Sequence, residues 1–270
     1  MEPSVHRRVQ LSTGLGTSYL EQGSPSVASP LVLLHAWGES KRAFVRLLAA
    51  LSPTMRVVVP DLRGHGEADK PDTGYGLAEL ASDVTALLDL LEVDSAILVG
   101  ASSGGYVAQQ VAVSDPGRVA GLVLAGSPRS LLGQAPFADE LEELTDPINP
   151  DWVREFTSGF AVEAEVPDWY TDLLVEDAVQ IPARVWRASL AGLSDSVPPT
   201  TFGSITAPTL IISGEHDRLL SRDEFQTLAL MVPGSRWVEY AHTGHLVLWE
   251  QPEQLAEDIT TWLSDHSLLG

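Results

Sequence analysis

Short apolar runs alternate with longer amphipathic stretches along this chain, and this alternation limits the fold to a few architectures. Strands are predicted at 31–35, 56–60, 96–100, 119–124, 209–213 and 236–240. Helices are predicted at 41–51, 77–91, 106–114, 222–231 and 252–263. Because the strand runs are apolar without interruption, they favour a mainly parallel sheet that is covered by helices on both faces. Weaker runs around Val9 and at 18–20 indicate an N-terminal hairpin at the sheet edge.

One long segment, residues 131–202, breaks this alternation. It contains no convincing core strand, and prolines repeatedly interrupt its helical patterns. We predict that 1–130 and 203–270 form one α/β core domain and that 131–202 is a helical cap, or lid, over the sheet. Aromatic side chains gather in this segment, and we expect Trp152 and Trp186 to line a substrate site. Any single one of these aromatic residues could instead pack the small core of the insertion itself.

The composition narrows the class of protein. The formal net charge is −21, which disfavours binding to phosphate backbones or anionic lipid. No cysteine is present, so disulfides, thiolate metal sites and a cysteine nucleophile are excluded. No apolar run is long enough to span a bilayer, and no signal peptide is visible at the N-terminus. We therefore expect a cytoplasmic protein that binds neither nucleic acid nor membranes.

A candidate nucleophile directly follows the strand predicted at 96–100. The sequence there reads Gly100-Ala101-Ser102-Ser103-Gly104, a Gly-x-Ser-x-Gly pattern between a strand and a helix. Such a turn presents the serine on a strained bend, and its glycines allow the strand and helix to approach each other. Ser102 is preferred because it has a glycine on both sides of it in the pattern. Ser103 is the neighbouring alternative.

A serine hydroxyl needs a base to take its proton. His245 is the candidate base because it follows the strand at 236–240, and Gly244 allows its loop to bend back. His242 is the local rival, although it leaves the strand almost at once.

The base in turn needs an orienting acid. Asp217 is the candidate, directly after the strand at 209–213, with Glu215 and Asp223 as alternatives. The loop after the strand at 119–124 offers no carboxylate, which favours Asp217. The resulting chain order of serine, aspartate and histidine is the one expected for a nucleophile on this kind of turn.

The negative charge that develops on the attacked carbonyl oxygen needs N–H donors, which together form an oxyanion hole. The backbone N–H of Ser103 is one candidate, since it follows the nucleophile. The second should come from the loop His35-Ala36-Trp37-Gly38, and Trp37 is the preferred residue. Its indole would then wall the acyl pocket, so that Trp37 also counts as a substrate-binding residue.

With these elements in place, the sequence resembles the α/β-hydrolase fold family over nearly its whole length. The resemblance is closest to the branch of small esterases, lactonases, perhydrolases and carbon–carbon bond hydrolases. It extends to the loop at 59–66, which is structural in the family, so Asp61 and His65 receive no catalytic role. It also includes Gly244-His245 and the following Glu250-Gln251-Pro252-Glu253. The chain departs from the family where Ala36 replaces the usual glycine of the oxyanion loop.

The resemblance implies an α/β fold in which a mostly parallel central sheet is flanked by helices and carries a helical cap insertion. It implies a serine hydrolase that cleaves a carboxylic ester or lactone through an acyl-enzyme, with no metal or cofactor. The aromatic insertion favours a small-molecule substrate that is largely apolar, and it allows a bulky one. The sequence predicts no oligomeric state.

Three other functions stay open at this point. Carbon–carbon bond hydrolysis would need a cation for the substrate carboxylate, which Arg184 or Arg187 would supply if either faced Ser102. Perhydrolysis would use the same three residues. A non-catalytic small-molecule receptor on the same scaffold is the alternative outside enzymes.

Overall fold

An eight-stranded sheet forms the centre of the computed structural model, which describes residues 5–24, 29–134, 137–160 and 163–268. The strand order is β1-β2-β4-β3-β5-β6-β7-β8. Strand β2 is antiparallel to both of its neighbours, and all strands from β4 to β8 run parallel. The strands are β1 (Val5–Gln10), β2 (Gly16–Gln22), β3 (Leu31–Leu34), β4 (Val57–Pro60), β5 (Ala96–Ala101), β6 (Val119–Ala125), β7 (Thr209–Gly214) and β8 (Arg236–Tyr240).

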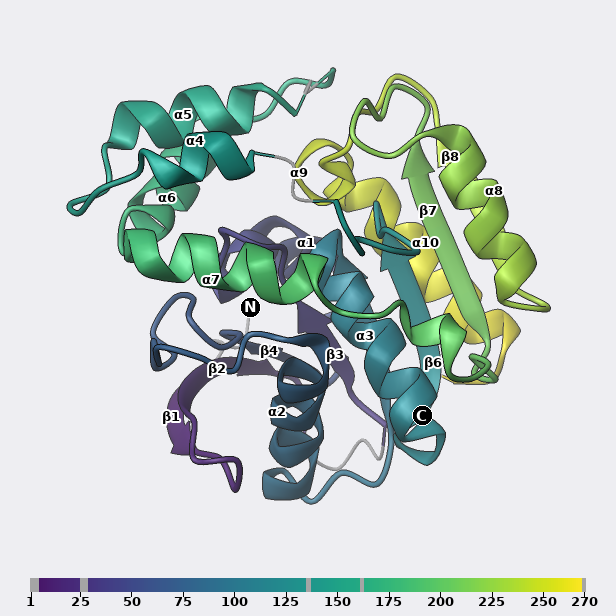
Figure 1. Ribbon diagram of the computed structural model, residues 1–270. Helices are drawn as coiled ribbons and strands as arrows, with labels where there is room; N and C mark the ends of the chain where they lie inside the picture. Colours follow the sequence, from purple (N-terminus) through teal and green to yellow (C-terminus); the bar gives the residue numbers. More distant parts are fainter. Residues whose placement is uncertain (1–4, 25–28, 135–136, 161–162, 269–270) are drawn as a thin grey trace.

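Helices cover both faces of this sheet (Figure 1). One face carries α2 (Leu77–Leu90), α3 (Ser103–Ser114) and α8 (Arg222–Met231), and the other carries α1 (Val45–Ala50), α9 (Val247–Glu250) and α10 (Pro252–Asp265). Successive side chains of a strand point to opposite faces, so Leu33 packs with α1 and α10 while Leu34 packs with α2 and α3. Short 3₁₀ turns complete this layer: η1 (Lys41–Phe44), η2 (Pro116–Arg118) and η3 (Pro199–Thr201).

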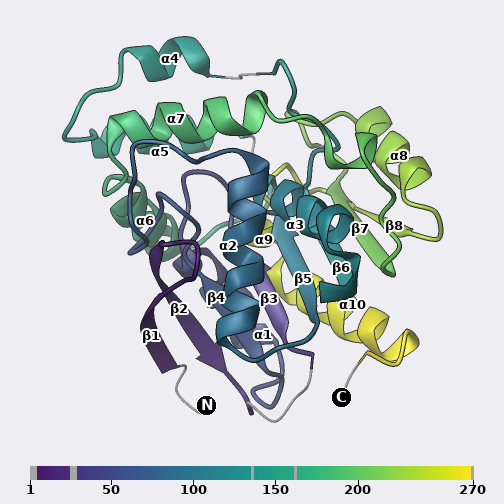
Figure 2. The same cartoon turned by 60° about the horizontal axis from the view of Figure 1, so that its bottom comes forward.

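Between β6 and β7 the chain forms a helical insertion. Its helices are α4 (Ala138–Glu142), α5 (Pro150–Ser158), α6 (Asp168–Ala178) and α7 (Ala183–Ser194). Pro150 is the first residue of α5, where a proline loses no helical hydrogen bond, and Pro167 and Pro182 directly precede α6 and α7. The described part of the insertion has its own apolar cluster around Phe156 and Trp186. Figures 1 and 2 show these helices grouped together on one side of the sheet.

The predicted architecture is confirmed, including the N-terminal hairpin and the six later strands. Most element boundaries differ from the predicted ones by no more than two residues, and two helices differ more. The helix predicted at 41–51 is a 3₁₀ turn followed by α1, and the helix predicted from Tyr106 begins at Ser103 instead. In the described residues no helix has the length and apolar character needed to cross a membrane.

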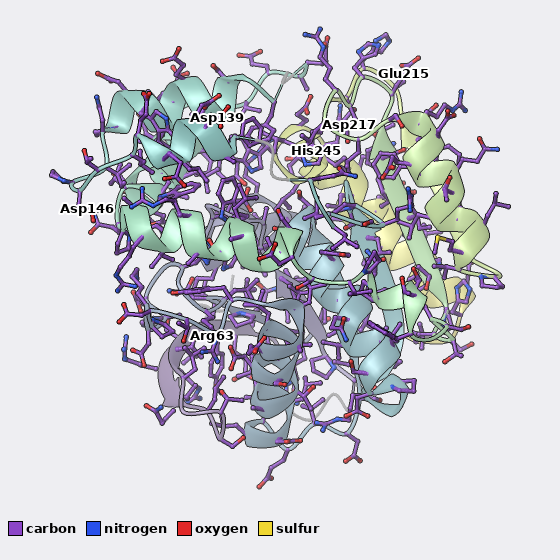
Figure 3. All side chains as sticks on the ribbon, in the orientation of Figure 1. Arg63, Asp139, Asp146, Glu215, Asp217 and His245 are labelled. Atoms are coloured by element: carbon purple, nitrogen blue, oxygen red, sulfur yellow. The ribbon has the colours of Figure 1, made fainter. Side chains whose placement is uncertain are left out.

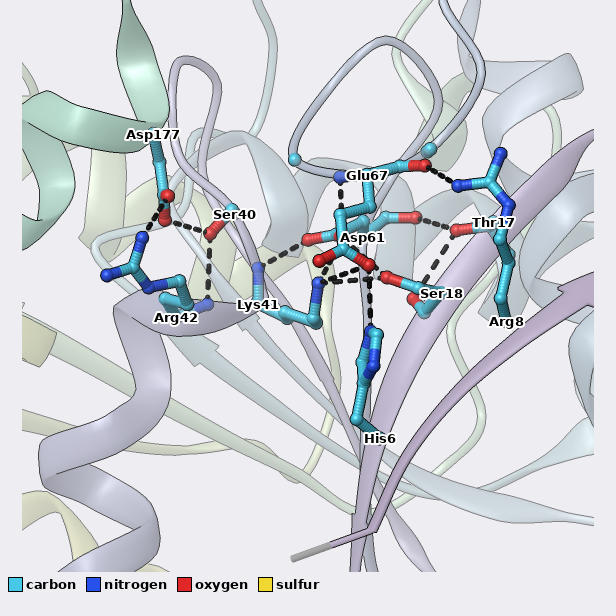
Figure 4. A network of polar contacts seen from close by, with 12 residues as sticks. His6, Arg8, Thr17, Ser18, Ser40, Lys41, Arg42, Asp61, Glu67 and Asp177 are labelled. Carbon is cyan, nitrogen blue, oxygen red and sulfur yellow. Dashed lines mark hydrogen bonds and ion pairs between the residues drawn. The ribbon is translucent and has the colours of Figure 1, made fainter. Parts of the chain in front are cut away.

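A buried polar network ties the end of β4 to the neighbouring loops (Figure 4). Asp61 accepts hydrogen bonds from Lys41 Nζ at 2.6 Å and from Ser18 Oγ at 2.9 Å. It also accepts the backbone N–H groups of Lys41 and Glu67. Burial alone would raise the pKa of Asp61, but the Lys41 ammonium and these hydrogen bonds hold that pKa below its usual value. The carboxylate is therefore a charged anchor for the start of the loop at 61–67.

His35 fixes the loop after β3 to the same region. Its Nε2 accepts the backbone N–H of Leu62 at 2.9 Å, which leaves the proton on Nδ1 for the carbonyl of Ala36 at 2.8 Å. Burial lowers the pKa of His35, so the ring stays neutral in this arrangement. Neutral His35 thus links two loops that follow adjacent strands.

Candidate active site

Ser102 occupies the sharp turn between β5 and α3. Its backbone has φ 47° and ψ −120°, a region that non-glycine residues rarely adopt, and its N–H donates to the carbonyl of Ala125 at 2.8 Å. A side chain on Gly100 would collide with the backbone of Gly105, and one on Gly104 would collide with the carbonyl of Leu34. These close approaches explain why the turn needs glycine on both sides of Ser102.

The structure brings Ser102, His245 and Asp217 into one chain of hydrogen bonds. Ser102 Oγ lies 3.0 Å from His245 Nε2, and His245 Nδ1 lies 2.8 Å from Asp217 Oδ2. The side chains of His245 and Asp217 are almost completely buried. Because the carboxylate accepts the proton on Nδ1, Nε2 is left free to accept the serine hydroxyl. Figure 3 shows Asp217 and His245 beside each other on the loops that follow β7 and β8.

The second oxygen of Asp217 is also engaged. Asp217 Oδ1 accepts the backbone N–H groups of Leu219 at 2.8 Å and Leu220 at 2.9 Å. The carboxylate is therefore fixed by its own loop, and it meets the imidazole without rearrangement.

The sequence alternatives lie elsewhere. Glu215 accepts the backbone N–H of His242 at 3.2 Å, and both residues are exposed. Asp223 is exposed in the first turn of α8. The Ser103 hydroxyl accepts the backbone N–H of Trp37 and makes no hydrogen bond with a histidine among the described residues. The geometry thus favours the set Ser102, His245 and Asp217.

The two residues predicted for the oxyanion hole are in direct contact. The backbone N–H of Trp37 donates to Ser103 Oγ at 2.7 Å. The N–H of Ser103, at the start of α3, has no acceptor among the described residues. The indole N–H of Trp37 donates to Ser189 Oγ on α7 at 2.9 Å. The sequence predicted the two backbone groups but gave no sign that the Ser103 side chain would take up one of them.

A pocket opens above Ser102, with about 890 Å³ of empty space, its open mouth included. Trp37 and Trp186 line it as expected, together with Ser103 and His245. The insertion contributes Phe137, Val153, Phe156, Phe160, Trp186 and Leu190 to its wall. Trp152 does not reach this pocket; it stacks on Phe156 at a ring-centre distance of 5.2 Å and faces a second groove.

No lysine or arginine is among the described residues that line the pocket. Arg184 donates to the carbonyls of Lys70 and Pro71, and Arg187 donates to those of Leu141 and Leu144. Neither guanidinium therefore supplies a cation beside Ser102. The described part of the chain also holds no group of three His, Asp or Glu side chains arranged to bind a metal ion.

A model of the alpha/beta hydrolase family matches residues 31–258, which is most of the chain. The chain belongs to the alpha/beta hydrolase family. The protein YisY of Bacillus subtilis, an AB hydrolase superfamily member, is 27% identical over 84% of this chain and 88% of its own length.

Two solved structures of similar proteins extend this comparison. The esterase RhEst1 from Rhodococcus sp. ECU1013 has a TM-score of 0.81 and 26% identity, and the match covers 98% of this chain and 99% of that structure. Est816, an N-acyl homoserine lactone degrading enzyme, has a TM-score of 0.79 and 29% identity, with coverages of 94% and 99%. These likenesses support a hydrolase.

Two buried glutamates, Glu39 and Glu250, support the site of this alpha/beta hydrolase, and the sequence assigned a role to neither. Glu39 accepts the backbone N–H of Ala36 at 3.0 Å and the indole N–H of Trp249 at 2.7 Å. Burial raises the pKa of the Glu39 carboxyl, and these hydrogen bonds oppose that rise. Glu39 therefore holds the loop that carries Trp37. Its position four residues after a predicted strand end was the available signal.

Glu250 supports the loop of His245. Its carboxylate accepts the backbone N–H of Gly244 at 3.0 and 3.1 Å. It also accepts the N–H groups of Glu163 and Ala164 in the insertion, at 2.8 and 3.1 Å. The sequence placed Glu250 in a family signature but could not show which amides it would bind.

Proposed function

We propose that this protein is a serine hydrolase that cleaves carboxylic esters or lactones of largely apolar substrates through an acyl-enzyme. The observation that carries the proposal is the hydrogen-bonded chain of Ser102, His245 and Asp217 at the base of an apolar pocket. The similarity of this protein to the esterase RhEst1 and to the lactone-degrading enzyme Est816 supports the same class of reaction.

In this mechanism Ser102 Oγ attacks the substrate carbonyl while its proton passes to His245 Nε2. Asp217 holds the imidazole in the required tautomer and stabilises the imidazolium. The backbone N–H of Ser103, which has no acceptor among the described residues, donates to the developing oxyanion. The Trp37 N–H, the other predicted donor, is held on Ser103 Oγ. His245 then protonates the leaving alkoxide, and it activates water to release the acid from Ser102.

The pocket supports a neutral, apolar acyl group. Aromatic and aliphatic side chains make up most of its wall, and no cation lines it among the described residues. Carbon–carbon bond hydrolysis of a dienoate usually needs such a cation, so the positions of Arg184 and Arg187 disfavour that alternative. In this proposal residues 131–202 act as a cap on the core formed by 1–130 and 203–270, since the insertion supplies one wall of the pocket.

The test is a panel of p-nitrophenyl esters and lactones of graded acyl size, with Ser102→Ala as the matched variant. We expect wild-type turnover on apolar substrates and a loss of about 10⁴-fold or more in kcat for Ser102→Ala, as for other triad members. Hydrolysis that survives in Ser102→Ala would refute the assigned nucleophile. Tight binding without turnover across the panel would indicate a receptor, and faster acyl transfer to peroxide than to water would indicate a perhydrolase.

A further inference from the structure

The hydroxyl of Ser103 lies beside the candidate nucleophile with its hydrogen unused. Ser103 lines the pocket next to Ser102 although it is only 8% exposed. Its Oγ accepts the N–H of Trp37 at 2.7 Å. In the described part of the chain no group accepts the hydrogen of this hydroxyl. A buried hydroxyl normally donates as well as accepts, so this hydrogen is available to a ligand in the pocket.

The loop that carries the Trp37 N–H is fixed beside Ser103. Two hydrogen bonds hold this loop. The Ala36 N–H donates to the Glu39 carboxylate, and the indole N–H of Trp37 donates to Ser189 Oγ. Gly38 next to it has φ +83° and packs so closely on Trp186 that an added Cβ would lie 2.5 Å from the indole. The loop is therefore fixed on both sides of the amide. The Trp37 N–H therefore stays on the Ser103 hydroxyl as long as that side chain keeps its position.

We propose that the Ser103 hydroxyl is itself a catalytic donor of the oxyanion hole, an inference that rests on the proposed hydrolase function. The Trp37 N–H polarises Ser103 Oγ, and the hydroxyl passes this polarisation on to the carbonyl oxygen of the substrate. The oxyanion then accepts hydrogen bonds from both the backbone N–H and the side-chain O–H of the same residue. Ser103 thus does more than follow the nucleophile in the turn.

The experiment compares Ser103→Ala with Ser103→Thr, which keeps the hydroxyl. We expect kcat to fall roughly tenfold to a hundredfold in Ser103→Ala with KM little changed, because the donor acts mainly in the transition state and the backbone N–H remains. Ser103→Thr should recover most of this loss. Ser194→Ala is the matched control, since it removes a similarly buried hydroxyl hydrogen bond outside the pocket lining.

The inhibition constant of a trifluoromethyl ketone that carries the acyl chain of a good substrate measures directly how well the oxyanion hole stabilises an oxyanion. Ser102 Oγ adds to its carbonyl carbon, the serine proton moves to His245, and the carbonyl oxygen becomes an oxyanion without any leaving group. We expect the inhibition constant in Ser103→Ala to rise by the same factor as kcat falls.

Two results would overturn the inference. One is an unchanged or higher kcat in Ser103→Ala, which would mean that the hydroxyl only fills the hole until substrate displaces it. The other is equal ketone affinity in wild type and Ser103→Ala. Equal affinity refutes the role of Ser103 even if the wild type hydrolyses esters. Absence of all ester and lactone turnover, with ketone binding that still depends on the Ser103 hydroxyl, refutes the proposed function instead.

Discussion

Both oxygens of the Glu250 carboxylate lie within hydrogen-bonding distance of the N–H of Gly244, the residue before His245. One of these oxygens also accepts two amides of the insertion, from Glu163 and Ala164. Glu250 is buried, so its charge is balanced by these N–H groups rather than by water. A single carboxylate therefore couples the position of the insertion to the loop that carries the candidate base.

Replacing Glu250 with glutamine should impair both stability and rate. The glutamine amide presents N–H groups where the backbone already supplies donors, so one or more buried amides lose their acceptor. We expect a loss of about 1–3 kcal/mol in the free energy of unfolding and a fall of about tenfold in kcat. Chemical denaturation and steady-state kinetics measure the two effects.

Glu253→Gln is the control for this variant. Glu253 lies in the same segment, but its side chain is exposed and its ion pair with Arg46 is 3.6 Å long. Its substitution should change stability by less than about 1 kcal/mol and leave kcat unaltered. Equal behaviour of the two variants would mean that the Glu250 contacts do not position His245.

Asp217→Asn tests the choice of acid. The asparagine can present an N–H to His245 Nδ1, which favours the tautomer whose Nε2 carries the proton and cannot accept from Ser102. We expect kcat to fall by about 10⁴-fold, the loss known for this change in another triad. Glu215→Gln and Asp223→Asn should keep near wild-type kcat on the same ester, because neither carboxylate contacts His245. A large loss in either of these, with an active Asp217→Asn, would reverse the assignment.

Much of the fold and the three polar residues of the site could be predicted from sequence, for a physical reason. Uninterrupted apolar strands specify a parallel sheet, and the carboxyl ends of parallel strands lie at one edge. Ser102, Asp217 and His245 each follow a different strand, so the topology alone brings them to that edge.

The supporting contacts could not be predicted in the same way. The side chains of Glu250 and Ser103 accept hydrogen bonds from backbone N–H groups. Nearly every residue has such a group, so no residue pattern in the sequence identifies the donors. Trp152 illustrates the limit for side chains. Its aromatic character suggested that it would line the pocket. Its position on α5 instead stacks its ring on Phe156, outside the pocket lining. The side of a short helix that faces a ligand depends on packing with α7 and the core, which the sequence does not encode locally.

Asp61→Asn should reveal how much the buried ion pair with Lys41 contributes. Asparagine removes the closer charged partner of the Lys41 ammonium, which is almost fully buried, and leaves only half-exposed Glu67 at 3.6 Å. We expect a loss of about 3–5 kcal/mol in the free energy of unfolding at neutral pH. Glu176→Gln removes an exposed partner of Arg42 and should cost less than about 1 kcal/mol.

The pH dependence follows from the depressed pKa of Asp61. The folded protein binds the Asp61 proton more weakly than the unfolded chain does. The contribution of Asp61 is therefore complete above its usual pKa near 3.8 and is lost as the pH falls through the lower, folded-state value. The stability difference between wild type and Asp61→Asn should shrink across that acidic window. A difference that stays constant with pH would show that the ion pair is not its source.

Trp186 sets the size of the pocket where the insertion meets the oxyanion loop. Its ring is fully buried, lies edge-on to Trp37 with a centre distance of 4.9 Å, and covers Gly38. Its indole N–H has no hydrogen-bond partner among the described residues, so truncation removes packing alone. Trp186→Ala should therefore cost about 3–5 kcal/mol in stability and enlarge the pocket that we propose for the acyl group.

The expected consequence is a change in specificity rather than a uniform loss. The ratio of kcat/KM for a branched acyl ester to that for an acetate should rise by about tenfold or more in Trp186→Ala, and by less in Trp186→Phe. Trp169→Ala is the matched control, because that tryptophan is 57% exposed and lies outside the pocket lining. If the two alanine variants show the same ratio as the wild type, the acyl group does not occupy the space beside Trp186. Because Trp186 belongs to the insertion and lines the pocket, a rise in the ratio would place the acyl chain against the insertion.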